Sequence, residues 1–98
     1  MKKFKIVIVG GASTYTPGIV KGLITNNDEL PLKELVLVDI NEQRLDTMGG
    51  YIKILMARYL PEVKVSWTTN REEAFPGTDF FFVQIRPGGL KQREQDEK

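Results

Sequence analysis

The chain has 98 residues, of which 41% are hydrophobic and 28% are charged, and its formal net charge is +1. These values are typical of one soluble globular domain or part of one, and the charge gives no general attraction to nucleic acid or acidic membranes. The chain contains no Cys and no His, which excludes disulfides, thiolate or imidazole metal ligands and His-based catalysis within these residues.

The apolar patterning gives no sign of a membrane or secretory segment. No run of about 20 apolar residues is present. The apolar run near the N-terminus ends at Gly10, which is short of the roughly 7–15 residues of a signal-peptide core. We therefore expect a cytoplasmic protein with a mature N-terminus and with neither nucleic acid nor membrane as a partner.

The first predicted element is a buried strand over residues 4–9, because this run is apolar, rich in β-branched side chains and ended by glycine. A helix follows, with Thr16 predicted as its N-cap and Pro17 in its first turn. The polar run 26–28 is predicted to end this helix.

Residues 34–40 predict a second buried strand with Asp39 at its C-terminal end. Asn41 is the predicted N-cap of a long helix that Pro61 ends. Its apolar stripe comprises Leu45, Met48, Ile52, Leu55, Met56 and Tyr59. Close packing is the simplest reason for the pair Gly49-Gly50 inside this helix, where each glycine costs about 1 kcal/mol relative to Ala.

The remaining predicted elements are an alternating edge strand at 63–67, a short helix at 70–75, a turn at 76–79 and a strand at 79–85. Strands that alternate with helices indicate parallel pairing through helical crossovers. The sequence therefore predicts an α/β fold with a Rossmann-like parallel sheet in the strand order 3-2-1-4.

The turn after the first strand has the composition of a phosphate-binding corner. Glycine lets the backbone turn sharply and approach a ligand, while the following helix offers free N–H groups to an anion. The G-x-G-x-x-G pattern is imperfect, because Ala12 and Tyr15 stand where the second and third glycines belong. A tight turn without a ligand is the alternative. The predicted cofactor-binding residues of this turn are Gly10, Gly11, Ala12, Ser13 and Thr14.

Acidic and basic side chains follow two of the predicted strands. Asp39 could accept hydrogen bonds from ribose hydroxyls and would repel a 2′-phosphate, which favours NAD over NADP; helix capping is the alternative. Arg86 follows the fourth strand, and Arg93 lies nearby in the sequence. Both guanidinium groups suit phosphate. Their alternative role is to balance the acidic residues of the segment 94–97.

The stretches "VGGASTYTP", "ELPLKELVLVDI" and "QIRPGGLKQREQDE" together resemble glycoside hydrolase family 4. Within that family, "YTP" and "ELP" are most similar to the 6-phospho-β-glucosidases. The resemblance implies hydrolysis of phosphorylated glycosides with NAD and a divalent metal, commonly Mn²⁺. It implies oxidation at C3 of the sugar, removal of the C2 proton by a tyrosine, elimination from C1, addition of water and return of the hydride.

The resemblance also assigns roles to individual positions. It places Gly10 to Thr14 and Asp39 at the NAD site, Arg86 near the nicotinamide and Arg93 at the phosphorylated sugar. Ala12 departs from the family pattern, in which many members have glycine. The implied metal ligands, a Cys and a His, and the tyrosine base match no residue of this chain, so no catalytic or metal-binding residue is assigned within it.

Family members are several times longer than this chain and usually form dimers or tetramers. The expectation is therefore that residues 1–98 form the N-terminal part of an NAD-binding Rossmann domain, without the catalytic C-terminal part, and are inactive alone. A stand-alone NAD-binding module is one alternative. An ordinary NAD-dependent dehydrogenase is another, but it leaves "GGLKQREQDE" unexplained.

Overall fold

The computed structural model describes residues 3–84. Its elements in chain order are β1 (Phe4–Val9), α1 (Thr16–Thr25), β2 (Leu32–Val38), α2 (Glu42–Tyr59), β3 (Lys64–Thr68), α3 (Arg71–Ala74) and β4 (Phe80–Val83). The four strands form one parallel sheet in the order β3-β2-β1-β4. The predicted fold class and strand order are confirmed.

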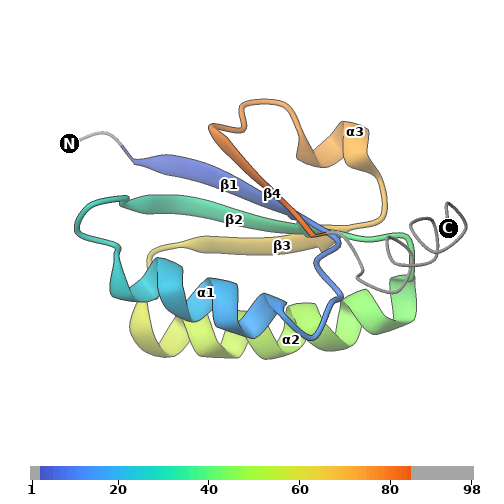
Figure 1. Ribbon diagram of the computed structural model, residues 1–98, viewed down its shortest axis with the longest axis horizontal. Helices are drawn as coiled ribbons and strands as arrows, with labels where there is room; N and C mark the ends of the chain where they lie inside the picture. The colour runs from blue at the N-terminus through green and yellow to red at the C-terminus, as the bar shows by residue number, and fades with distance from the viewer. Residues whose placement is uncertain (1–2, 85–98) are drawn as a thin grey trace, which may run out of the picture.

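Helices cover both faces of the sheet (Figure 1). The helices α1 and α2 pack on one face against Ile6 and Ile8 of β1 and against the inward side chains of β2. The intervening residues, such as Val7, point to the opposite face and pack with Ala74 of α3. This alternation explains why residues 6–8 of β1 and 35–38 of β2 are continuous apolar runs, since both faces of these segments are buried.

The N-terminal ends of the two long helices differ in how well the sequence predicts them. The side chain of Asn41 accepts a hydrogen bond from the Arg44 amide at 3.0 Å, so Asn41 caps α2 as predicted. The prediction that Thr16 caps α1 is wrong, because Tyr15 holds the cap position without a side-chain bond. Thr16 is fully buried, and its hydroxyl donates to the Gly11 carbonyl oxygen instead.

Close packing accounts for the first glycine inside α2. A Cβ atom on Gly49 would overlap the indole ring of Trp67 in β3, whereas a Cβ on Gly50 would meet open space. The Trp67 Nε1–H also donates to Asp46 Oδ1 at 2.9 Å, which fixes the ring against α2. Gly49 therefore allows α2 to approach β3, and Gly50 has no such role.

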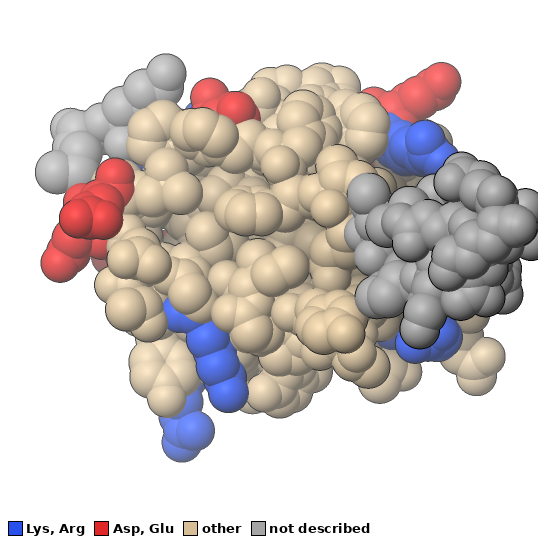
Figure 2. Space-filling view, viewed as in Figure 1, with Lys and Arg blue, Asp and Glu red and all other residues tan. Residues whose placement is uncertain are grey.

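The surface seen in Figure 2 is mainly uncharged, and its acidic and basic side chains lie in small groups near the rim. All four residues of β4 are exposed, although Phe80 and Phe81 make edge-to-face contacts with Phe4 and Phe75. Between residues 3 and 84, no helix is long and apolar enough to cross a membrane.

Candidate functional site

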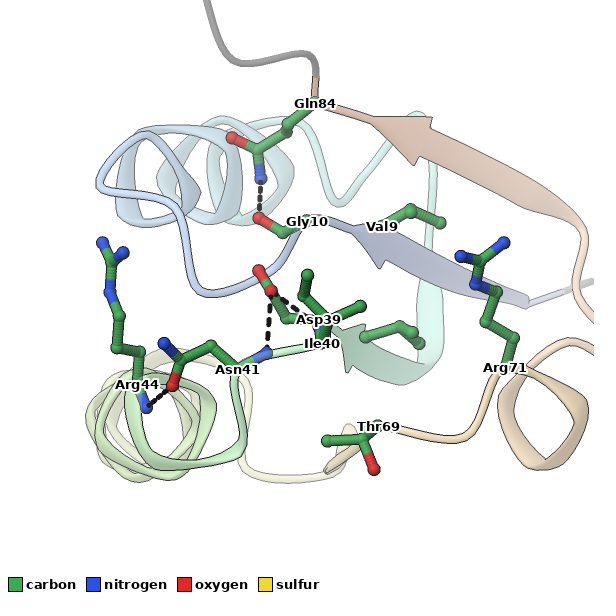
Figure 3. A pocket seen from close by; sticks show the side chains of 10 residues that line it. Val9, Gly10, Asp39, Ile40, Asn41, Arg44, Thr69, Arg71 and Gln84 are labelled. Carbon is green, nitrogen blue, oxygen red and sulfur yellow. Dashed lines mark hydrogen bonds between the residues drawn. The ribbon is translucent and has the colours of Figure 1, made fainter. Parts of the chain in front are cut away.

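A cleft of about 430 Å³ lies at the carboxyl ends of β1 and β2, beside the residues that follow β3 and β4 (Figure 3). The chain runs outward from β1 to β2 and β3 and then returns to the other side of β1 at β4. The strand order therefore reverses between β1 and β4, and open α/β sheets bind their ligands at such a switch point. The lining residues are Val9, Gly10, Val38, Asp39, Ile40, Asn41, Arg44, Thr69, Arg71 and Gln84.

The glycine pair lets the β1–α1 loop lie directly on β2. Gly10 has a φ of +82°, a left-handed conformation that favours glycine. The amides of Gly10 and Gly11 both donate to the Val38 carbonyl oxygen, at 2.7 and 2.9 Å. A Cβ on Gly11 would lie 2.7 Å from Leu37 Cβ, so a larger residue would push the loop away from the sheet.

The loop amides differ in whether they are free to meet an anion. The Ala12 amide donates to Asp39 Oδ2 at 2.9 Å, and the Ser13 amide donates to the Gly10 carbonyl oxygen at 3.0 Å. The amide of Thr14 makes no hydrogen bond to any residue that the structure describes, and Thr14 is exposed. The donor that remains open at this corner is therefore the Thr14 amide, rather than the amides of the glycine pair.

Asp39 joins the loop to the end of β2. It is only 7% exposed, and its Oδ1 atom accepts from the amides of Ile40 and Asn41 at 2.7 and 3.3 Å. With the Ala12 bond, three of the roughly four acceptor positions of a carboxylate are in use. One acceptor position therefore remains for a ligand, and the capping side chain of α2 is Asn41 rather than Asp39.

Eight lining residues were not among the predicted site residues: Val9, Val38, Ile40, Asn41, Arg44, Thr69, Arg71 and Gln84. Ile40 is 86% exposed beside the buried Asp39, so it offers an apolar surface at the mouth of the cleft. Seven of the eight end a strand or follow its carboxyl end within three residues, and this position was the available signal. Arg44 lies in the first turn of α2 and gave no such signal.

Two predicted residues, Arg86 and Arg93, lie outside the described residues. From residue 3 to residue 84, no group of three or more His, Cys, Asp or Glu side chains could hold a metal ion. This part of the chain therefore offers donors suited to a nucleotide but no site that fits Mn²⁺.

Comparison with known proteins identifies relatives along the whole chain. The family model described as Family 4 glycosyl hydrolase matches residues 5–98. The phospho-alpha-glucosidase PagL of Clostridium acetobutylicum is 48% identical over 100% of the chain and 22% of its own length. The chain thus spans about 22% of the length of this curated relative.

Two solved structures have the same arrangement of strands and helices. A 6-phospho-alpha-glucosidase from gut microorganisms, in complex with NAD and Mn²⁺, matches with a TM-score of 0.84 and 45% identity over 98% of this chain and 22% of that one. The 6-phospho-beta glucosidase of Thermotoga maritima, with NAD and glucose-6-phosphate, matches with a TM-score of 0.79 and 33% identity over 98% and 22%.

Proposed function

Because the chain belongs to glycosyl hydrolase family 4, we propose that its cleft binds the NAD cofactor of a 6-phospho-glucosidase. Residues 1–98 would then form the first half of the NAD-binding domain. The observation that carries the proposal is the corner at which Ala12 and Asp39 meet, beside the free Thr14 amide and the exposed Ile40. Two solved relatives whose structures contain NAD support it.

The adenosine half of NAD would lie over the end of β2. Asp39 has one acceptor position left on Oδ2, which suits one ribose hydroxyl. Ile40 would contact the adenine ring, since an apolar side chain that is 86% exposed gains free energy when a ring covers it. In this arrangement Asp39 recognises the ribose and, through Ala12, also holds the loop.

The diphosphate would lie across the β1–α1 loop. The Thr14 amide is its N–H donor, and the hydroxyls of Ser13 and Thr14 are further candidate donors. Gly10 and Gly11 would act by bringing the backbone close to the ligand rather than by donating, because their amides already bond to Val38. The nicotinamide half would then extend toward β4, which precedes Arg86.

The substrate of the proposed enzyme is a phosphorylated glucoside whose phosphate meets Arg93. Bound NAD would supply a hydride acceptor for the sugar's C3, as in the redox-assisted elimination that the sequence resemblance implies. The sequence motifs favour the β-anomer. The relative and the structure named for α-glucosides are 48% and 45% identical to this chain, whereas the structure named for β-glucosides is 33% identical. We therefore propose the α-anomer first and keep the β-anomer as the competing prediction.

The test is an assay of the product of the full reading frame on chromogenic α- and β-glucoside 6-phosphates, with and without NAD and Mn²⁺. The proposal predicts turnover of one anomer that needs both additions and produces no net NADH. Turnover that persists after removal of both would overturn it. NADH formed in proportion to substrate would indicate an ordinary dehydrogenase, and NAD binding without hydrolysis of either anomer would favour a stand-alone binding module.

A further inference from the structure

We infer that Gln84 is a positioning residue. It joins the end of β4 to the β1–α1 loop and thereby fixes the part of the loop on which the cofactor's diphosphate would lie. This inference rests on the proposed function. Gln84 follows β4 and lies 74 positions from Gly10 in sequence. Its backbone amide donates to the Val9 carbonyl oxygen at 3.1 Å, which places the side chain beside the start of the loop.

The Gln84 side chain makes two bonds to the loop and to the first turn of α1. Its Nε2 atom donates to the Gly10 carbonyl oxygen at 3.1 Å, as Figure 3 shows, and to Thr16 Oγ1 at 3.0 Å. The Thr16 hydroxyl in turn donates to the Gly11 carbonyl oxygen at 2.9 Å. Gln84 and Thr16 thereby hold two consecutive carbonyl groups of the loop.

The direction of every hydrogen bond in this network is determined. A carbonyl oxygen only accepts, so the amide nitrogen of Gln84 must face Gly10. The Thr16 hydroxyl gives its one proton to Gly11 and is left to accept from Gln84. The three bonds therefore join Gln84, Thr16 and the loop in one network.

Two further observations describe how Gln84 packs against the loop. A Cβ on Gly10 would lie 3.3 Å from both Gln84 Cβ and the Gln84 carbonyl oxygen. The Gln84 Oε1 atom is buried and accepts no hydrogen bond from any described residue. A buried oxygen without a partner costs free energy, so Oε1 does not stabilise the position of the Gln84 side chain. The two hydrogen bonds that Nε2 donates do stabilise it. Hydrogen bonds to the Gly10 and Gly11 carbonyl oxygens fix the orientation of these two peptide groups, beside which the diphosphate is proposed to lie.

The experiment compares binding of adenosine, ADP and NAD to the product of the full reading frame. Thr16→Val keeps the side-chain shape but removes the hydroxyl, and Gln84→Met keeps the length but removes both donors. Each variant loses two neutral hydrogen bonds, which predicts about threefold to tenfold weaker binding of ADP and NAD. Adenosine, which lacks the diphosphate, should bind each variant within about twofold of the wild type, since its contacts lie on β2 rather than on this network.

Two additional variants separate positioning from a general loss of structure. Thr16→Ser retains a hydroxyl and should recover most of the ADP affinity that Thr16→Val loses. Thr25→Val removes a hydroxyl that bonds only to the Lys21 carbonyl oxygen in the same helix, so it is the matched control and should leave ADP binding unchanged. In the double variant of Gln84 and Thr16, the loss should be smaller than the product of the two single losses, because the residues share a bond.

The outcomes distinguish failure of the role inferred for Gln84 from failure of the proposed NAD binding. Wild-type protein that binds neither ADP nor NAD would overturn both. Wild-type binding with unchanged ADP affinity in Thr16→Val and Gln84→Met would overturn only the role of Gln84. Equal losses of adenosine and ADP affinity would also overturn it, because they would indicate a general structural role.

Discussion

The amide of Ala12 donates to Asp39 Oδ2 at 2.9 Å across 27 positions of sequence, and this bond joins the β1–α1 loop to the end of β2. The same carboxylate meets the amides of Ile40 and Asn41 through its other oxygen. Asp39 is thus held in place by backbone donors on both sides. In the proposed function, the recognition of a ribose and the shape of the loop would therefore depend on one side chain.

The variant Asp39→Asn tests this double role. An asparagine has one oxygen and one NH₂ group, so its NH₂ would face an amide N–H from either Ala12 or Ile40. We expect NAD to bind more weakly by about 1–3 kcal/mol, the scale of a lost hydrogen bond between a ribose hydroxyl and a charged carboxylate. Calorimetric titration of the product of the full reading frame measures it, and wild-type affinity in Asp39→Asn would contradict the assignment.

The exposed Ile40 provides a second test of the adenosine position. In Ile40→Ser, the free energy of unfolding should change little because the side chain is 86% exposed. Binding of NAD and adenosine should weaken by about 1–2 kcal/mol through loss of apolar contact. The matched control is Ile54→Ser on α2, where a 73% exposed isoleucine does not line the cleft. Equal affinities in the two variants would show that Ile40 does not contact adenine.

The two adjacent glycines of α2 give opposite predictions for stability. Gly49→Ala would drive a methyl group into the Trp67 ring and should lower the free energy of unfolding by about 1–3 kcal/mol. Gly50→Ala meets open space and should raise it by roughly 0.5–1 kcal/mol, the difference in helix propensity. Urea unfolding measures both, and a shift of the same sign in the two variants would contradict the packing described for α2 and β3.

Arg93 lies outside the described residues, and its role rests on the sequence resemblance. Arg93→Ala should raise the KM for the phosphorylated glucoside, because a guanidinium that pairs with a phosphate is lost. The affinity for NAD should stay unchanged. Steady-state kinetics combined with NAD titration measures the two effects. A loss of NAD affinity as large as the loss for sugar would refute this division of roles.

The sequence predicts the elements of this fold better than the contacts between them. β1 follows from its apolar run, and the N-terminal end of α2 follows from Asn41, because these signals are local. The burial of Thr16 could not be predicted, since its partners Gly11 and Gln84 depend on how β4 packs beside β1. Pairings between distant residues leave no periodic pattern in a single sequence.

In the candidate site, too, local features could be predicted from the sequence and contacts between distant residues could not. The glycine turn and Asp39 were predictable because each follows a buried strand and has a residue type with a known use there. The bond between Ala12 and Asp39 was not, and it changes which loop amide is open to an anion. Ile40 was overlooked because an isoleucine after a strand resembles the strand's own last residue.

A crystal structure of the product of the full reading frame grown with NAD would show where the cofactor lies. We expect a ribose hydroxyl of the adenosine within hydrogen-bond distance of Asp39 Oδ2, with the diphosphate at the Thr14 amide. NAD bound elsewhere, or bound in this cleft with its ribose away from Asp39, would contradict it.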